Sequence, residues 1–500
     1  MRKKKAIKNI LTSLIFQIVM VIIGFVVPKM IIEKYGSNTN GIIQSITQFL
    51  SYISLFQAGF GPVVKSLLYK PLIDNDKAKI NNILYAAQKF FRRIMYIFIV
   101  YILALMIFYP IISNTEFDNT YIISLILIIS ISTFAEYFWG LTYSLLLDAD
   151  QRLYVYTYIQ LGSVIFNFIF TVILINCGTS IHIVKFIGGI IYAIKPLLLY
   201  SYVRKKYQIS FKNVDKGYKI KQQWDGLAQH IAAVIHGNTD VVVLSIFSTM
   251  KEVSVYSVYN FVVLGLRNVV SSIINGLSSG FGDIIARKEI AKLNKSFNAY
   301  ECIYHTFITI VYTCALVLII PFESAYTYGI EDANYIRPLF GFLIIFAEFI
   351  NSIKSPYANL AVSAGKFKET RNGACIEAAL NLVISIILVF NFGLIGVAIG
   401  TGIAMIYRTI DFIIYDSKNI LKRKKYIALV KMCVDIIEAL AISLIIKKTI
   451  VINCYNYVDF IKYGIAVLAI VSIVVLMINL LFYRNDLKDI KEYFIKNGKK

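Results

Sequence analysis

Of the charged side chains that stand inside long apolar runs, five are the residues of this chain most able to bind a charged ligand. They are Arg267, Lys195, Lys354, Glu136 and Glu348. A charge kept at bilayer depth usually faces a protein interior, a partner or a water-filled cavity. The three cations could bind an anion, and an arginine suits phosphate oxygens in particular because its guanidinium can bind two of them at once.

Arg267 lies on a polar stripe of its apolar run, residues 254–281. The stripe also holds Tyr256, Asn260, Ser271 and Asn275, at spacings that a helix would bring to one face. Arg267 could face a cavity as an anion ligand, or it could pair with a carboxylate of a neighbouring helix. The predicted substrate-binding cavity comprises Arg267, Lys65, Lys195, Lys354, Glu136, Glu348, Asn260, Ser271 and Asn275.

Three of these predicted cavity residues have alternative roles. Lys65 lies close to the cytoplasmic end of its segment, where it could instead reach lipid phosphates. Glu136 and Glu348 could counter the cations, bind substrate hydroxyls or carry a proton, and pairing between helices is the structural alternative.

A second polar group could bind a coupling ion. His236 and Asp240 are four residues apart, Asn381 and Ser385 are four residues apart in a later segment, and Thr401 belongs to the next one. Oxygen ligands suit a hard cation, so Asp240, Asn381 and Thr401 could hold Na⁺, whereas Asp240 with His236 could carry a proton. A neutral polar network that holds the helices together is the alternative. The sequence indicates no other cofactor.

These residues are carried by about fourteen apolar segments, each long enough to cross a ~30 Å hydrocarbon core as a helix. The chain is 58% hydrophobic and 16% charged, with a mean hydropathy of +0.68. An all-α integral membrane protein is therefore expected, and an ordinary soluble enzyme is excluded. The segments are residues 9–32, 41–69, 94–112, 121–147, 154–176, 183–203, 224–247, 254–281, 297–320, 336–360, 373–391, 394–414, 428–449 and 460–482.

The net charge of +22 follows from topology. If the N-terminus is cytoplasmic, most Lys and Arg fall at the cytoplasmic side, as the positive-inside rule requires, and both termini lie there. The excess then attracts anionic membrane lipids and does not indicate nucleic-acid binding. The cytoplasmic basic clusters are residues 2–8, 70–93, 204–221, 287–295, 366–371, 418–431 and 484–500.

The chain repeats itself at a nearly constant offset. The tripeptide Phe-Ala-Glu at residues 134–136 recurs at 346–348, and VIFNFIFTVILINCG at 164–178 aligns with AALNLVISIILVFNFG at 378–393. Each unit covers six segments, so the halves share an orientation and a parallel pseudo-twofold axis relates them, with a substrate site expected at their interface. The predicted parts are an N-lobe (1–203), a basic linker (204–223), a C-lobe (224–415) and two further helices with a basic tail (416–500).

The N-terminal part resembles the Wzx-type polysaccharide flippases of the multidrug/oligosaccharidyl-lipid/polysaccharide exporter superfamily, which are related to the lipid II flippases. The resemblance rests on Lys8-Asn9, Ser13, Gln17, Gly24, Pro28, Tyr35-Gly36 and NGIIQSITQFLSYISLFQAGFG at 40–61. The layout matches over nearly the whole chain.

The resemblance implies that the protein moves an undecaprenyl-pyrophosphate-linked oligosaccharide from the inner to the outer leaflet of a bacterial cytoplasmic membrane. It would do so by alternating access, without enzymatic activity, for capsule, O-antigen or exopolysaccharide biosynthesis, beside polysaccharide polymerase and glycosyltransferase partners. Arg267 matches a cavity arginine of the lipid II flippases, and Asp240, Asn381 and Thr401 match their sodium ligands. Ser385 replaces a second acidic ligand, so Na⁺ and H⁺ both remain open. The alternative function is a multidrug or organic-cation antiporter of the same superfamily.

Overall fold

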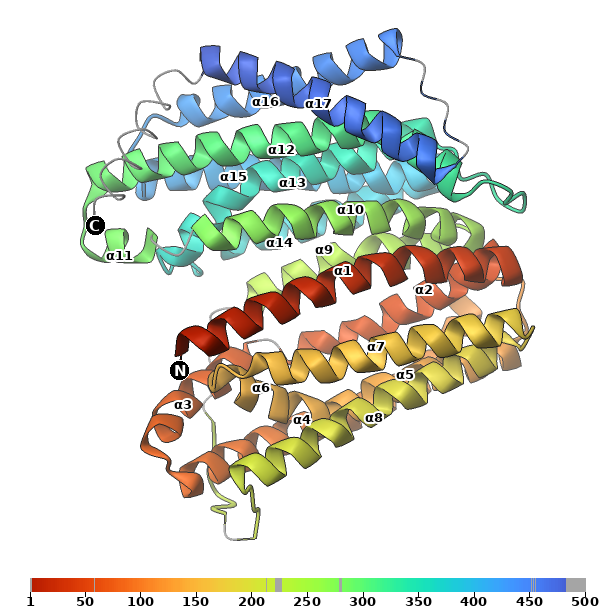
Figure 1. The fold of residues 1–500 in the computed structure, drawn as a ribbon, viewed down its shortest axis with the longest axis vertical. Helices are drawn as coiled ribbons and strands as arrows, with labels where there is room; N and C mark the ends of the chain where they lie inside the picture. The colour runs from red at the N-terminus through yellow and green to blue at the C-terminus, as the bar shows by residue number, and fades with distance from the viewer. Residues whose placement is uncertain are drawn as a thin grey trace. The chain divides into compact units, whose positions relative to one another are not determined.

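The computed structural model describes residues 2–57, 59–212, 214–220, 227–277, 281–450, 452, 454 and 456–482. Within these ranges the chain is helical and contains no strand. It divides into two compact units, Met1–Ser254 and Val255–Lys500, each drawn in Figure 1 as a group of helices lying side by side. The lobes and linker drawn from the sequence repeat stay a prediction, and parts of that linker and of the basic tail lie outside the described residues.

The first unit begins with α1 (Arg2–Tyr35), a helix that packs on α7 and α2. Two predicted segments of this unit are interrupted, and α9 packs on the first of them. The other helices of the unit are α2 (Ser37–Ser51), η1 (Tyr52–Gln57), α3 (Phe60–Asp74), α4 (Lys77–Ile112), α5 (Asn119–Ala135), η2 (Glu136–Gly140), α6 (Leu141–Ala149), α7 (Leu153–Asn176), α8 (Ile181–Tyr207) and α9 (Leu227–Phe247).

The interruptions have local causes. Gly59 takes a positive φ of 72° between η1 and α3, a conformation that an L-residue with a side chain rarely adopts. The other break is a single turn of π-helix, η2, which follows α5 and leads into α6. Turns of this kind add one residue to a helix and are frequent at functional sites. Here the turn begins at Glu136, one of the predicted cavity carboxylates.

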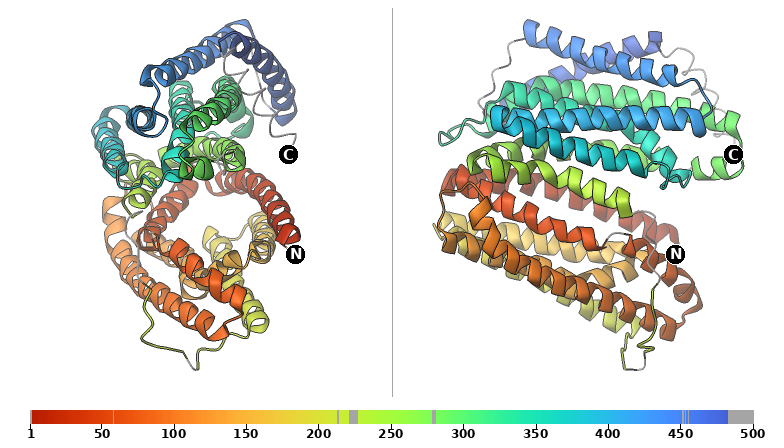
Figure 2. Two further views of the ribbon diagram at one scale, coloured as in Figure 1. Left: turned by 90° about the vertical axis from the view of Figure 1, so that its left-hand side faces the viewer. Right: turned by 180° about the vertical axis from the view of Figure 1, so that it is seen from behind.

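The second unit is built around α12, which packs on α13, α16 and α17. Both views in Figure 2 show the two C-terminal helices, in blue, along one side of this unit. An apolar cluster that includes Val317, Ile442 and Val471 attaches them to α12. The helices are α10 (Met250–Leu277, begun in the first unit), α11 (Phe281–Ala286), α12 (Ile290–Tyr326), α13 (Pro338–Ser363), α14 (Arg371–Phe392), α15 (Leu394–Asn419), α16 (Lys425–Thr449) and α17 (Tyr457–Phe482).

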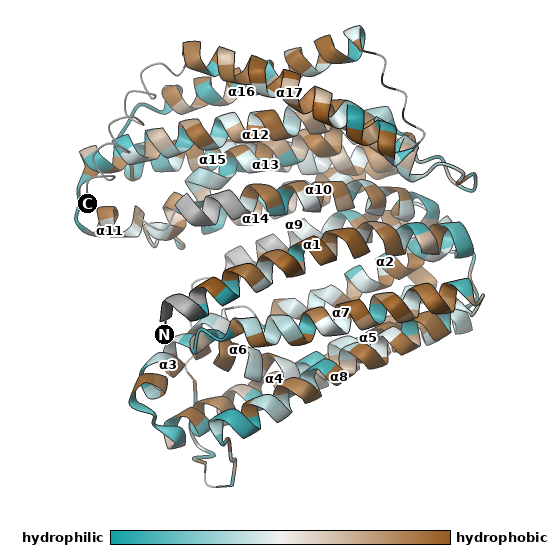
Figure 3. Cartoon of the chain, viewed as in Figure 1, coloured by the Kyte–Doolittle hydropathy of each residue, from teal (hydrophilic) through white to brown (hydrophobic). Residues whose placement is uncertain are grey.

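Each predicted apolar segment coincides with a helix or an interrupted helix. Eleven of the described helices are long and apolar enough to cross a membrane. The three remaining predicted segments are the broken segment 41–69, the segment that forms α9, and the segment that forms α16. The last of these carries the charged residues Lys431, Asp435 and Glu438. Figure 3 shows long brown, apolar stretches along the helices and teal residues mainly near their ends. The all-α fold of a multi-pass membrane protein is thus confirmed.

Candidate substrate-binding and ion-binding residues

Arg267 of α10 forms a bidentate ion pair with Glu348 of α13. Its Nε donates to Glu348 Oε1 at 2.9 Å, and its Nη2 donates to Oε2 at 2.5 Å. Asn351, one helical turn along α13, donates from Nδ2 to the same carboxylate at 3.2 Å. The Glu348 side chain is 5% exposed and that of Arg267 is 36% exposed. The pair therefore has a buried acidic partner and a guanidinium that is partly open.

The open edge of Arg267 is Nη1, which makes no hydrogen bond to the described residues. The two bonds to Glu348 fix the plane of the guanidinium, so this edge has a defined direction. An anion could bind there without breaking the pair. The structure thus shows the carboxylate partner that the sequence left as one of two alternatives, and substrate binding by Arg267 stays a prediction.

The repeat-related carboxylate of the first unit, Glu136, pairs with a different helix. Lys195 of α8 lies with its Nζ 2.7 Å from Glu136 Oε2, and the same Nζ lies 3.4 Å from the Tyr156 hydroxyl of α7. Gly140, at the end of η2, faces this carboxylate closely: a Cβ there would lie 2.8 Å from Glu136 Oε1. The π turn and the glycine together make room for the Glu136–Lys195 pair.

Lys354 belongs to a chain of charges at the α13–α14–α15 junction. Its Nζ lies 3.2 Å from Glu377 Oε1, while Arg408 lies 3.2 Å from Glu377 Oε2 and 2.6 Å from Asp411. Arg408 and Asp411 are three residues apart on α15, a spacing that lets two side chains of one helix meet. Glu377, however, which shares a helical row with Asn381 and Ser385, is committed to two cations. Lys354 is consequently already neutralised within the protein.

The remaining predicted cavity residues belong to α3 and α10. Lys65 bonds to Asp148 of α6 at 2.7 Å, and both side chains are partly exposed. Asn260 and Ser271 are half-buried on α10, on the stripe that carries Arg267. Asn275 is in α10, but its side chain lies outside the described residues.

Three of the predicted ion ligands come together in the second unit. Asn381 Nδ2 donates to Thr401 Oγ1 at 2.8 Å, and Ser385 Oγ donates to the Val397 carbonyl at 3.4 Å. Asn381 and Ser385 are fully buried, and Asn381 Oδ1 has no hydrogen-bond partner among the residues that the structure describes. This orphaned oxygen and the hydroxyls suit a hard cation such as Na⁺. All of them are neutral, and the helices meet closely because Gly400 leaves room for Ser385.

The predicted acidic ligand lies in the other unit. Asp240 of α9 is 7% exposed, next to the buried Thr239. The side chain of His236 lies outside the described residues. Among the residues described, no group of three or more His, Cys, Asp or Glu side chains is placed to hold a metal ion.

Sequence reasoning missed a buried charge cluster on α12. Glu301 is fully buried and accepts from Arg423 at 2.7 Å and from Lys431 of α16 at 2.9 Å. The Tyr357 hydroxyl of α13 donates to the same carboxylate. The cluster ties α16 and the turn before it to α12 and α13. No signal in the sequence marks it, because Glu301 and Arg423 are far apart in the chain and lie near the ends of their segments.

One helical turn deeper, His305 of α12 bonds to Asp435 of α16, with Nδ1 2.5 Å from Oδ2 and both side chains fully buried. Asp435 had no obvious partner in the sequence, and the spacing of Lys431, Asp435 and Glu438 along one face of α16 is the signal that could have indicated a polar contact. Glu438 is 5% exposed, and neither of its oxygens has a hydrogen-bond partner.

Comparison with known proteins yields no matching family model and no matching curated protein, but it yields solved structures. "Lipid II flippase MurJ, inward closed conformation" matches at a TM-score of 0.70 and 16% identity, covering 95% of this chain and 99% of that one. An inward-facing multidrug resistance MATE family transporter of the MOP superfamily matches at 0.59 and 11% identity, covering 82% and 97%. The eukaryotic MATE transporter AtDTX14 matches at 0.55 and 14% identity, covering 85% and 98%.

Of these three neighbours, one is a flippase and two are MATE transporters. The MurJ match extends over more of this chain than either MATE match. The chain has the fold of the MOP-superfamily transporters, and within that fold it matches the lipid II flippase MurJ over nearly its full length.

Proposed function

We propose that the protein is a non-hydrolytic flippase that moves an undecaprenyl-pyrophosphate-linked oligosaccharide from the inner to the outer leaflet of a bacterial cytoplasmic membrane. Rocking between inward-open and outward-open states would carry the headgroup across, and the product would serve surface polysaccharide biosynthesis. The fold match to MurJ over 95% of the chain supports a lipid-linked substrate. The Wzx-like N-terminal residues support an oligosaccharide headgroup.

The observation that carries the proposal is the open Nη1 edge of Arg267. Burial of Glu348 holds the guanidinium in one orientation while its third nitrogen remains available for an anion. Charge-assisted bonds to phosphate are short, directional and about twice as strong as neutral ones. A pyrophosphate bound at this edge would place the sugars in the wet interior and leave the polyprenyl tail in lipid.

The rival function, export of cationic drugs, fits these residues less well. A cationic substrate would need an acidic site, whereas Glu136, Glu348 and Glu377 are each paired with a protein cation. Drug susceptibility of a deletion strain distinguishes the two: a flippase predicts unchanged susceptibility together with loss of surface glycan.

The direct test is a leaflet assay with lipid-linked oligosaccharide in proteoliposomes. A sugar-binding lectin added outside should detect the substrate only after the purified protein has moved it outward. A protein that gives no lectin-accessible substrate in sealed vesicles, and whose deletion leaves surface polysaccharide intact, would contradict the proposal.

For coupling, we propose that Asp240 supplies the charge and that Asn381, Ser385 and Thr401 supply the neutral oxygens for Na⁺. The orphaned Asn381 Oδ1 supports an ion ligand at that place. The absence of a carboxylate at Ser385 makes H⁺ on Asp240 the competing coupling ion. Dependence of transport on Na⁺ at constant pH separates the two.

A further inference from the structure

A pocket of the first unit gathers cations from two distant basic clusters. It has a volume of about 330 Å³, and its walls include Phe60 and Phe90, whose rings stack with centroids 3.7 Å apart. The segment after α8 is held against α4 by a bond from the Asp215 backbone N–H to Asn82 Oδ1 at 2.9 Å. The cationic residues that line the pocket are Lys89, Arg93, Lys216 and Lys219.

Among the described residues these four cations have no ion-pair partner, and none of the described residues that line the pocket is an Asp or Glu. Lys89 and Arg93 are one turn apart on α4, so they face the same way. Like charges held together repel one another, so a concave basic site attracts an anion.

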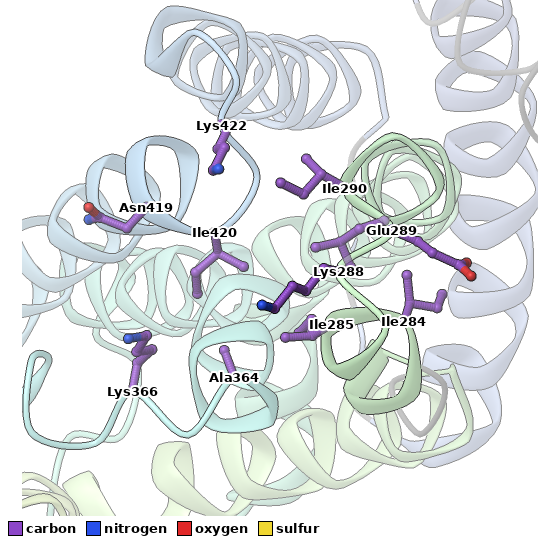
Figure 4. A pocket seen from close by; sticks show the side chains of 11 residues that line it. Ile284, Ile285, Lys288, Glu289, Ile290, Ala364, Lys366, Asn419, Ile420 and Lys422 are labelled. Atoms are coloured by element: carbon purple, nitrogen blue, oxygen red, sulfur yellow. The ribbon is translucent and has the colours of Figure 1, made fainter.

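A pocket of the second unit repeats this chemistry with other residues. It has a volume of about 260 Å³, and Figure 4 shows Lys288, Lys366 and Lys422 with Ile420 between them and Ile285 beside Lys288. The carboxylate of Glu289 points away from these amino groups in Figure 4 and pairs with Lys292 at 3.0 Å instead.

The three lysines of this second pocket come from three separate turns. Lys288 follows α11, Lys366 lies between α13 and α14, and Lys422 lies between α15 and α16. Lys366 forms an exposed pair with Glu369, whereas Lys288 and Lys422 form no ion pair with the described residues. Each lysine belongs to a different basic cluster that the sequence places at the cytoplasmic side.

We propose that these two basic pockets each hold the headgroup of an anionic phospholipid of the inner leaflet. Both pockets place cations beside apolar side chains. A phospholipid needs both, because its phosphate is anionic and its acyl chains are apolar. Basic pockets at the cytoplasmic ends of transmembrane helices bind anionic lipid headgroups in this way. The volumes, about 330 and 260 Å³, lie at and just below the lower limit of the ~300–1,000 Å³ range of small-molecule sites, which suits a headgroup better than an oligosaccharide. The inference goes beyond the proposed transport activity and does not depend on which lipid is moved.

Native mass spectrometry of the full-length protein tests the proposal. The probes are dioleoyl phosphatidylglycerol and, as the zwitterionic match with the same chains, dioleoyl phosphatidylcholine. The first-pocket variant is Lys89→Gln/Arg93→Gln/Lys216→Gln/Lys219→Gln, and its control is Lys79→Gln/Lys205→Gln/Lys206→Gln/Lys212→Gln, which removes four exposed cations near the same ends of α4 and α8. The second-pocket variant is Lys288→Gln/Lys422→Gln, and its control is Lys368→Gln/Lys418→Gln. Size-exclusion profiles confirm that all variants are folded.

The wild-type chain should retain phosphatidylglycerol in preference to phosphatidylcholine. Each pocket variant should lose about tenfold or more of that preference, whereas the controls should keep it. Equal losses in pocket and control variants would mean diffuse attraction and would overturn the proposal, as would an unchanged preference in the pocket variants. Inorganic phosphate and undecaprenyl pyrophosphate are added as competitors: displacement by either at lower concentration than phosphatidylglycerol would assign the pockets to free phosphate or to the transported lipid instead.

Discussion

The guanidinium of Arg267 and the carboxylate of Glu348 are joined by two hydrogen bonds, 2.9 and 2.5 Å long, between α10 and α13. The acid is buried and the arginine is one-third exposed. A pair of this geometry can serve stability alone, or it can hold the arginine in place for an anion. The two roles respond differently to substitution.

Replacing Arg267 with Ala should strongly reduce export of surface glycan, because it removes the proposed phosphate ligand and leaves Glu348 buried without its cation. Loss of a bond to a charged group costs about 1.5–3 kcal/mol, which corresponds to roughly a 10–100-fold slower flipping rate. The measurement is lectin-accessible substrate in proteoliposomes, normalised to folded protein.

The double variant Arg267→Leu/Glu348→Leu separates the roles. It removes both charges, so it should fold well, since apolar replacement of a buried ion pair is often neutral for stability. It should nevertheless remain inactive. Normal transport by this double variant would show that the pair is purely structural.

Gly140→Ala should reduce thermal stability, although alanine favours a helix. The added Cβ would lie 2.8 Å from the Glu136 carboxylate, which Lys195 holds at 2.7 Å. The control is Gly162→Ala on α7, where a Cβ meets nothing within 4 Å and where a gain of up to about 1 kcal/mol is expected. In a Glu136→Ala background, Gly140→Ala should no longer lower the unfolding temperature. Thermal unfolding of the wild type, the two single variants and the double variant can show this. An undiminished penalty in that background would mean that the glycine serves another contact.

The apolar segments, the all-α fold and the position of Glu136 opposite Glu348 in the repeat could be predicted from the sequence. The partners of these acids could not. Glu136 takes a lysine from α8, whereas Glu348 takes the arginine of α10, so the repeat conserves the acid and not its partner. The ion-pair partner of each carboxylate depends on how its helix is rotated about its axis and, for Glu136, on the π turn. The hydrophobic periodicity of the sequence indicates neither of these.

Glu377 shows the same limit in the second unit. Glu377 stands in one helical row with Asn381 and Ser385, yet it pairs with Lys354 and Arg408 and not with the polar residues of that row. The spacing of residues along one helix predicts which side chains face the same way. It does not predict which neighbouring helix each side chain contacts. One helical turn, about 5.4 Å along the axis, is enough to separate a structural ion pair from a candidate ion site.

Glu438 and Asp435 of α16 should differ in their tolerance of neutral substitution. Glu438 is buried without a hydrogen-bond partner, so Glu438→Gln removes no contact and should change the free energy of unfolding by less than about 1 kcal/mol. Asp435→Asn weakens the buried bond to His305 and should cost about 1–3 kcal/mol. Thermal unfolding in detergent gives both values. If Glu438→Gln proved the more damaging change, this carboxylate would have a partner that the present conformation does not contain.

Asp240→Asn should uncouple transport from its ion gradient, because it replaces the acidic member of the proposed coupling group by a neutral side chain of the same shape. Residual downhill flipping should persist, while the stimulation by a Na⁺ or H⁺ gradient should be lost. Thr401→Val is the companion variant: it removes the hydroxyl that accepts from Asn381 Nδ2 at 2.8 Å. If Na⁺ couples, both variants lose Na⁺ stimulation at constant pH. If H⁺ couples through Asp240, Asp240→Asn alone loses the response to a pH gradient and Thr401→Val keeps it. A gradient response that survives Asp240→Asn would remove Asp240 from the coupling mechanism altogether.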